Sequence, residues 1–334
     1  MEDRYITLAH GNGGRFMREL IDSVFARHLA NPGLDVHADA VTLPLLGKEL
    51  MFTTDGFSVQ PLEFPGGNIG SLAVHGTTND LAVAGAIPRY LSLNAFIEEG
   101  LEVAQLERIV ISLAKAAQEI EVQVVAGDTK VVPRGDGGGL YLATTGIGVR
   151  EKQHSLALDQ IMPGDAILVS GSVGDHGTAV MLAREQFGLK GSLESDAASV
   201  LPLTQILMEY NGLRFMRDPT RGGLATVVHE ISHITGHTVR LQQQEIPVRP
   251  QVQSVCEMLG FDPHYLACEG RVVAVIDNAQ ADDALEAMRQ HPSALEAALI
   301  DHVEGEGGHV VLETELGGER ILEELEDDPL PRIC

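Results

Sequence analysis

The sequence predicts a two-domain protein of mixed helix and sheet that ends in a tail. At 334 residues the chain exceeds the size at which a single hydrophobic core stops growing. Strand and helix patterns alternate in both halves, and a polar, charged connection at residues 150–154 lies between them. We therefore expect domains at residues 1–150 and 155–313 and a tail at 314–334.

The first half begins with a glycine-rich stretch, residues 10–14, followed by apolar residues at helical spacing up to Leu29. Such a stretch suits either a phosphate cradle or a plain turn with a helix cap, and the residues alone leave both open. Periodicity then predicts strands at 50–54, 90–97, 122–126 and 140–149, a buried helix at 69–86 and an amphipathic helix at 101–120.

The second half repeats the alternation. We expect strands at 166–170, 272–276, 297–303 and 309–313, and helices at about 175–186, 195–211 and 279–290, with another ending at Ile234. Residues 217–223 bring Arg221 and backbone amides to a helix start, which suits an anion site or a helix cap. Neither half contains a dinucleotide fingerprint or a P-loop, so those nucleotide folds lack support.

Three aspartates stand in apolar surroundings: Asp55 and Asp128 at expected strand ends, and Asp80 in the buried helix. Each alone is typical of a turn or a structural position. Together, buried carboxylates repel one another unless a cation neutralises them. Hard oxygen ligands indicate Mg²⁺, which usually bridges carboxylates to phosphates. A strongly acidic protein could hold ATP in this way.

Composition excludes several functions. A net charge of −25 argues against nucleic-acid or anionic-membrane surfaces. No apolar run reaches the roughly 20 residues of a membrane span, and the N-terminus lacks the order of a secretory signal, so we expect a cytoplasmic protein. Three cysteines without paired spacing indicate reduced thiols, with Cys256 and Cys268 as small core residues.

The third cysteine, Cys334, is the last residue and follows an acidic run that contains glycine and proline. This composition predicts a mobile segment. A thiol on a free end can enter a distant pocket or be modified by another protein, and the alternative is a frayed tail that happens to end in cysteine.

A series of motifs runs along the chain: His10-Gly-Asn-Gly-Gly14, Thr54-Asp55-Gly56, Asn79-Asp80, Gly127-Asp128-Thr129-Lys130, Asp218-Pro-Thr-Arg-Gly-Gly-Leu224, Glu269-Gly-Arg271 and Pro331-Arg-Ile-Cys334. In this order they resemble the HypE family of hydrogenase maturation factors, within the superfamily of aminoimidazole ribonucleotide (AIR) synthetase (PurM) and selenophosphate synthetase. The resemblance covers essentially the whole chain. The aspartate motifs are common to the superfamily, whereas the Gly-Asp-Thr-Lys and the terminal Pro-Arg-Ile-Cys single out the HypE family.

The resemblance implies a PurM-like fold: a homodimer whose N-terminal α+β domains pair their sheets into a barrel, with a C-terminal α/β domain over the ATP cleft. It also implies the activity. The carbamoyltransferase HypF places a carbamoyl group on Cys334, ATP drives its dehydration to a thiocyanate, and the cyanide passes to iron on the HypC–HypD complex for nickel–iron hydrogenase.

Residue roles follow from the same resemblance. Cys334 would carry the group, with Glu269 as proton acceptor and Lys130 orienting Glu269 or the activated oxygen. Asp55, Asp80, Asp128 and Asp218 would hold Mg²⁺. The expected ATP-binding residues are His10, Gly11, Gly13, Gly14, Asp55, Asn79, Asp80, Asp128, Thr129 and Thr145.

Two alternatives stay open. The chain could be another PurM-like kinase or synthetase that acts on a free metabolite, with Cys334 incidental. It could instead be a nucleotide-regulated scaffold whose acidic tail docks a partner. Selenophosphate synthetases carry a reactive cysteine or selenocysteine near a lysine in their N-terminal segment, and the absence of cysteine there weighs against that activity.

Overall fold

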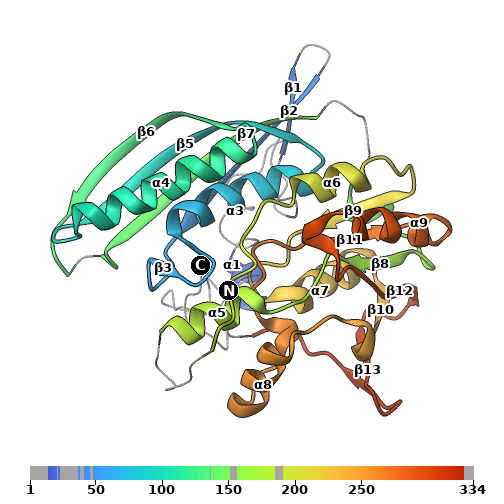
Figure 1. Cartoon of the computed structure of the whole chain (residues 1–334). Helices are drawn as coiled ribbons and strands as arrows, with labels where there is room; N and C mark the ends of the chain where they lie inside the picture. The colour runs from blue at the N-terminus through green and yellow to red at the C-terminus, as the bar shows by residue number, and fades with distance from the viewer. Residues whose placement is uncertain are drawn as a thin grey trace.

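The computed structural model of the chain describes residues 14–20, 22, 37, 41–45, 48–135, 137–150, 156–184 and 191–326, without the side chains of residues 17, 20, 41–48 and 129. Two β-sheets with their helices lie side by side, and helix α3, Ile69–Val83, runs between them (Figure 1). This confirms the predicted mixed, PurM-like architecture at the level of the single chain.

The first sheet has five strands in the order β1-β2-β7-β5-β6. Only β5 and β6 are parallel, and helix α4, Val103–Glu119, makes the crossover between them that a parallel pair requires. The strands are Val41–Leu45 (β1), Lys48–Phe57 (β2), Ile87–Glu98 (β5), Gln123–Val132 (β6) and Leu140–Arg150 (β7), and a separate ribbon pairs Glu63–Phe64 (β3) with Gly67–Asn68 (β4).

The two helices of the first half differ because their surroundings differ. α3 starts at a capping box in which the Asn68 side chain accepts from the backbone of Gly70 and Ser71, and the Asn68 N–H donates to the Ser71 hydroxyl. Most α3 residues are buried, because the sheet covers one side and the second half of the chain covers the other. α4 is amphipathic and buries one stripe, including Leu113.

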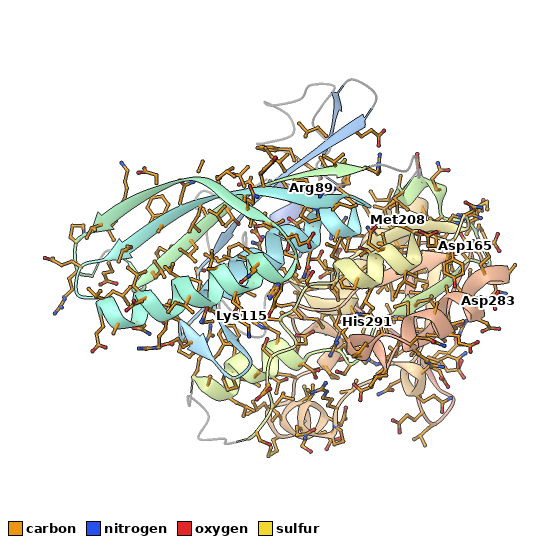
Figure 2. All side chains as sticks on the ribbon, turned by 45° about the horizontal axis from the view of Figure 1, so that its top comes forward. Arg89, Lys115, Asp165, Met208, Asp283 and His291 are labelled. Atoms are coloured by element: carbon orange, nitrogen blue, oxygen red, sulfur yellow. The ribbon has the colours of Figure 1, made fainter. Side chains whose placement is uncertain are left out.

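The other face of the first sheet carries no helix among the described residues (Figure 1). In Figure 2, Arg89 marks this sheet and Lys115 marks α4, on the covered side. β6 is an edge strand, and every residue from 123 to 131 whose side chain is described is exposed. Strands β2, β5 and β6 also expose large apolar side chains: Phe52, Tyr90, Phe96, Val124, Val125 and Val131.

The second sheet has seven strands in the order β14-β13-β10-β12-β8-β11-β9. Its strands are Ala166–Val169 (β8), Leu213–Arg217 (β9), His237–Gln242 (β10), Val273–Ile276 (β11), Ala298–Glu306 (β12), Val310–Glu313 (β13) and Glu319–Ile321 (β14). The helices outside the first half's α3 and α4 are Arg15–Leu20 (α1), Asp175–Ala183 (α5), Leu201–Leu207 (α6), Gly223–Thr235 (α7), Pro250–Leu259 (α8) and Asn278–Arg289 (α9).

Apolar side chains cover both faces of this second sheet. Val273 and Val275 of β11 join one core cluster with α7, whereas Ala274 and Ile276 join another with α6 and α9. Burial on both faces is why these strands appear in the sequence as unbroken apolar runs. A further cluster includes α5 and α8 together with residues of α3, α4 and the first sheet, so the two predicted domains share one core.

The predicted helix at 195–211 is wrong for its first part. Residues 191–200, here called the strap, are not helical, and α6 covers only residues 201–207. The backbone of the strap bonds to remote groups instead of to itself: the Ser195 N–H donates to the Pro65 carbonyl (2.9 Å), and the Val200 N–H donates to Asn79 Oδ1 (2.9 Å). Hydrogen-bond partners so distant in the sequence cannot be predicted from its hydrophobic periodicity.

No helix in the described part of the chain has the length and apolar character of a membrane span. Cys256 and Cys268 are buried free thiols, as predicted. Burial raises the pKa of the Cys256 thiol to about 12, so it stays protonated and unreactive near neutral pH.

Candidate functional site

Asp55 on β2 and Asp80 on α3 approach each other where the helix crosses the sheet. Thr53 and Asp55 point toward α3 because side chains alternate along a strand, and the Thr53 hydroxyl donates to Asp80 Oδ2 (3.0 Å). Gly76 of α3 lies opposite. A Cβ there would stand 3.8 Å from Asp55 Oδ2 and 2.7 Å from the Phe57 ring, so only glycine lets the helix come this close.

A cationic group from the second half lies beside this pair. Arg221 donates to Asp55 Oδ1 at 3.5 Å. It directly precedes α7, where Gly222 and Gly223 both adopt left-handed backbone conformations (φ 70° and 60°) that glycine accepts without strain. No side chain caps this helix start, so its positive end and Arg221 together suit an anion. Asp218, which is buried, belongs to the same segment.

The last described residues of the chain lie against the same helix start. Leu325 is 9% exposed, and its Cδ2 methyl would stand 3.0 Å from a Cβ at Gly222. The Arg15 N–H donates to the Leu325 carbonyl (3.2 Å), which brings α1 to the same place. A Cβ at Gly14 would overlap that carbonyl, so space requires the last glycine of the N-terminal motif.

The tail therefore begins later than predicted. Residues 319–321 form β14 against β13, and Leu322 is fully buried. The Tyr265 hydroxyl donates to the Glu323 carbonyl (2.6 Å), and His229 Nε2 bonds the Leu322 carbonyl (2.9 Å). These contacts fold the segment predicted to be mobile as far as residue 326, and Cys334 lies outside the described residues.

The side chain of Asn79, the neighbour of Asp80, hydrogen-bonds across the contact between the two halves of the chain. Its Nδ2 donates to the carbonyls of Ala198 (3.0 Å) and Glu269 (3.2 Å), and its Oδ1 accepts from the Val200 N–H (2.9 Å). The side chain that we predicted to contact ATP thus joins α3 to the strap and to the backbone of Glu269. Glu269 itself is buried.

Within one chain, Asp128 and Lys130 lie away from Asp55 and Asp80. The strand register aligns Asp55 with Gly127 on β6, with β7 and β5 between them. The three strand-to-strand spacings from β2 to β6 amount to about 14 Å. Asp128 is also exposed rather than buried. The expectation that Asp128 joins Asp55 and Asp80 in one cluster is therefore wrong for a single chain.

The faces of the sheet separate these residues further. Since Gly127 lies on the α3 face, alternation places Asp128 and Lys130 on the open face. Thr145 lies on the open face too, where its hydroxyl is 3.3 Å from that of Thr54. The predicted ATP-binding and catalytic residues are thus divided between the two sides of the sheet.

Some predicted residues cannot be placed. His10, Gly11 and Gly13 lie outside the described residues, as does the side chain of Thr129. Among the residues that the structure does describe, no group of three His, Cys, Asp or Glu side chains could hold a metal ion. Asp55 and Asp80 still suit Mg²⁺ that arrives with a nucleotide, because Mg²⁺ commonly takes one or two carboxylates plus phosphates.

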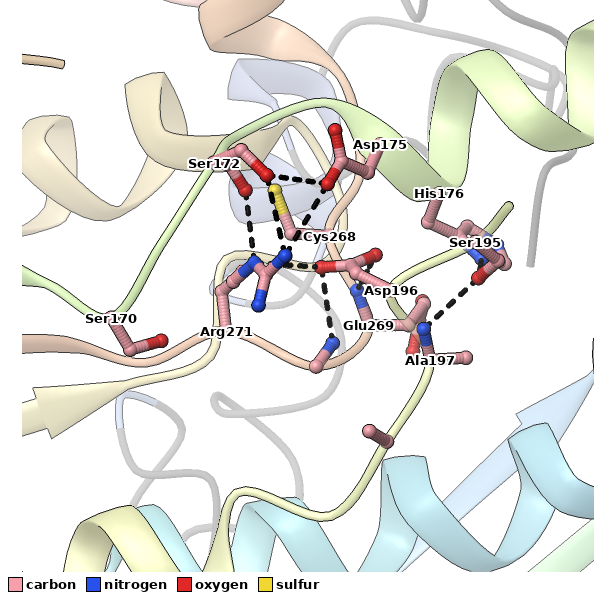
Figure 3. A network of polar contacts seen from close by, with 12 residues as sticks. Ser170, Ser172, Asp175, His176, Ser195, Asp196, Ala197, Cys268, Glu269 and Arg271 are labelled. Atoms are coloured by element: carbon pink, nitrogen blue, oxygen red, sulfur yellow. Dashed lines mark hydrogen bonds and ion pairs between the residues drawn. The ribbon is translucent and has the colours of Figure 1, made fainter. Parts of the chain in front are cut away.

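A buried network that sequence reasoning did not single out supports the Glu269 segment (Figure 3). Arg271 donates to the Ser172 carbonyl (2.9 Å) and lies 3.3 Å from Asp175 Oδ2 and 3.4 Å from Asp196 Oδ2. Burial raises the pKa of Asp175, against the lowering effect of its hydrogen bond with Ser172. Asp196 lies in what the sequence predicted as the first turn of a helix, where an acidic residue is ordinary, so it gave no functional signal.

Chemically, the site combines two carboxylates, a guanidinium and a helix start at the place where the chain's last described residues lie. This set can bind a metal-bound polyphosphate next to a C-terminal tail. Glu269, which is buried, is linked to this place through its backbone carbonyl, which accepts from Asn79, the neighbour of Asp80.

The chain is similar to known proteins over most of its length. Residues 37–150 match the model of the N-terminal domain of AIR synthase related proteins, and residues 162–313 match that of the C-terminal domain. The carbamoyl dehydratase HypE of Rhizobium leguminosarum bv. viciae is 44% identical over 98% of this chain and 95% of its own length. That of Escherichia coli K12 is 43% identical over 98% and 99%.

Solved structures are similar as well. A HypE–HypF complex contains a chain that is 41% identical, with a TM-score of 0.86 over 92% of this chain and 99% of that one. A HypE structure in complex with ATP is 43% identical, with a TM-score of 0.82 over 99% and 100%. Thiamine monophosphate kinase from Aquifex aeolicus, 17% identical with a TM-score of 0.66 over 92% and 99%, shares the fold.

Proposed function

Because the chain belongs to the AIR synthase related family and, within it, to the HypE carbamoyl dehydratases, we propose that it uses ATP to dehydrate an S-carbamoyl group on its own Cys334 to a thiocyanate. The thiocyanate supplies cyanide for the iron of nickel–iron hydrogenase. In this proposal HypF delivers the carbamoyl group, the HypC–HypD complex accepts the cyanide, and the reaction takes place in the cytoplasm.

One observation carries the proposal: the last described residues lie beside the anion-binding elements. Leu325 packs at the start of α7, next to Arg221 and hence to Asp55. Cys334 is then only the eighth residue beyond Glu326. Eight extended residues span at most about 28 Å, which is enough for the thiol to return to the site and too little for a distant search.

The chemistry suits these groups. The amide oxygen of a carbamoyl thioester is a poor leaving group, and phosphoryl transfer from ATP converts it into phosphate. Loss of both nitrogen protons and of the C–O bond then forms C≡N, and ADP and inorganic phosphate leave. Bound Mg²⁺, held by Asp55 and Asp80, would neutralise phosphate charge. Arg221 and the amides of α7 would orient the phosphates.

Proton removal falls to Glu269, which is buried next to α3. A carboxylate can act as a general base when it lies within hydrogen-bond reach of the proton that it removes. Lys130 would orient Glu269 or the activated oxygen. Since Lys130 lies on the open face of β6, a neighbouring chain has to supply it.

The same surface supports a homodimer. β6 is an exposed edge, and apolar side chains such as Phe96 and Val124 lie exposed beside it. A second copy would pair this edge and cover those side chains, as in the barrel that the resemblance implies. The site would then draw Asp128 and Lys130 from the partner.

Intact-mass measurement tests the proposal directly. The chain, incubated with HypF, carbamoyl phosphate and ATP, should gain a carbamoyl group and then lose one water. Cys334→Ala should abolish both changes, whereas Cys256→Ala, which alters an inert buried thiol, should keep them. Full ATP turnover in Cys334→Ala would support a metabolite kinase instead, and no covalent change in the wild-type chain would support a scaffold.

A further inference from the structure

Glu269 stands on a segment without regular structure. Residues 266–272 run between the single turn Pro263–Tyr265 (η5) and β11, and none of them is helix or strand. A side chain on such a segment keeps its direction only if other contacts fix the backbone that carries it. Here these contacts come from Asp196 and Asn79.

Asp196 of the strap binds the backbone of the Glu269 segment from one side (Figure 3). Its Oδ1 accepts from the Glu269 N–H (3.2 Å) and its Oδ2 accepts from the Gly270 N–H (3.4 Å). From the other side, Asn79 donates to the Glu269 carbonyl (3.2 Å). Hydrogen bonds thus hold the Glu269 backbone on both sides, and the carboxylate makes two of them.

Burial makes this contact strong and specific. The Asp196 side chain is 1% exposed, and Arg271, 8% exposed, lies 3.4 Å from its Oδ2. Bonds from backbone N–H groups to a carboxylate are among the stronger hydrogen bonds, and a nearby guanidinium offsets the cost of burying the charge. A Cβ at Gly270 would overlap the Asp196 carbonyl, so the two segments are already in close contact.

Arg271 is in turn held by Ser172 and Asp175. It donates to the Ser172 carbonyl (2.9 Å), and its Nη2 lies 3.3 Å from Asp175 Oδ2. Arg249, from a different element, lies 3.2 Å from the same carboxylate. Positive and negative groups therefore alternate from Arg249 through Asp175 and Arg271 to Asp196, which gives the carboxylate a fixed position.

We propose that Asp196 is a positioning residue for the dehydration: by binding the amides of Glu269 and Gly270, it fixes the direction of the Glu269 carboxylate. This inference rests on the proposed function, because it takes Glu269 as the proton acceptor. Asp196 acts through the backbone of Glu269 and needs no contact with the substrate.

Asp196→Asn tests the role with little change in volume. Its amide has one oxygen and can accept only one of the two N–H bonds, and it loses the charge that faces Arg271. We expect the rate of water loss from the carbamoylated chain to fall between about 10- and 100-fold, as small misplacements of a catalytic group do. The KM for ATP should stay close to wild type. The thermal midpoint should fall, because Arg271 keeps its buried charge and loses a carboxylate partner, so the rate is measured at a temperature where the variant is fully folded.

Hydrogen exchange supplies a readout that does not depend on activity. The amides of Glu269 and Gly270 should exchange faster in Asp196→Asn, measured on a peptide covering residues 267–272. Asp283→Asn is the matched control: it makes the same chemical change on an exposed aspartate of α9, outside this network. It should leave both the exchange of this peptide and the dehydration rate unchanged.

Three results would overturn the inference: a wild-type rate in Asp196→Asn, unchanged exchange at both amides, or a rate loss that only follows a fall in the thermal midpoint. Should Asp196→Asn fail to fold, Asn79→Ser releases the same peptide from its carbonyl side and should lower the rate likewise. Failure of the proposed function shows separately, as a wild-type chain that makes no thiocyanate while Asp196→Asn still speeds exchange.

Discussion

Chains carrying Lys130→Ala and chains carrying Glu269→Gln should each be inactive alone and should restore activity when paired. Lys130 points to the open face of β6, whereas Glu269 bonds Asn79 of α3 on the opposite side of the same sheet. If the two residues act on one carbamoyl group, they have to come from two chains. A pair of chains joined at the first sheet supplies one residue each.

The expected magnitude follows from two-fold symmetry. Random pairing of equal amounts makes about half of the dimers mixed. Each mixed dimer has one site with an intact Glu269 and the partner's intact Lys130, and one site that lacks both. The preparation should therefore recover about one quarter of the wild-type rate per chain.

The tail adds a second readout. Leu325 packs against Gly222 of its own chain, so the Cys334 that enters an intact site should belong to the chain that keeps Glu269. Intact mass should then show thiocyanate only on the Lys130→Ala chain, which a small mass tag distinguishes. Adding Cys334→Ala to that chain should abolish product, and adding it to the other chain should not.

The assay is single-turnover water loss after co-expression and refolding of the two tagged chains. The matched control pairs Lys130→Ala with the double variant Lys130→Ala, Glu269→Gln, which leaves no intact site in any dimer and should give no product. If mixed dimers form, as a sizing measurement would show, and still make no thiocyanate, the shared site is refuted.

Three further outcomes are expected. Asp80→Asn keeps an oxygen that can accept from Thr53 and should fold normally yet lose almost all Mg-ATP turnover; unchanged phosphate release would remove Asp80 from the site. Burial lowers the pKa of His75 to about 4 from 6.5, so the unfolded chain binds the proton first on acidification. This should lower the free energy of unfolding by about 2 kcal/mol between pH 7 and pH 5, and urea titrations of His75→Leu should lack that part of the loss. Asn79→Ala breaks three hydrogen bonds and should cost about 2 to 3 kcal/mol of unfolding free energy, whereas Gln253→Ala, at an exposed residue, should cost almost nothing; equal effects would contradict the role of Asn79 in joining the two halves.

Sequence patterns predicted the elements whose structure depends on local spacing. The amphipathic stripe of α4, expected at 101–120, lies at Val103–Glu119, and the apolar run expected at 272–276 is β11, Val273–Ile276. Prediction failed where contacts with residues distant in the sequence determine the local structure. Residues 195–200 have helix-compatible composition, yet the carbonyl of Pro65 and the amide of Asn79 take their backbone groups.

The site shows the same division. The Asp55–Asp80 pair was predictable, because both aspartates stand in apolar segments. The place of Asp128 was not, since its distance and its face depend on strand order and register, which periodicity does not contain. Asp196 was missed for a related reason: its role comes from the segment that it meets, Glu269–Gly270, and not from its own neighbours in sequence.

The shared core limits how this chain can move during a reaction cycle. Val180 of α5 and Val252 of α8 pack in one cluster with Phe57 and Leu72 of the first half, and all four side chains are buried. Separating the halves would expose this cluster and break the bonds of Asn79, at a cost of about 1.5 to 3 kcal/mol for each large side chain. We therefore expect the two halves to stay packed together during the proposed reaction, and cross-linking α5 to β3 should leave carbamoyl transfer and dehydration intact.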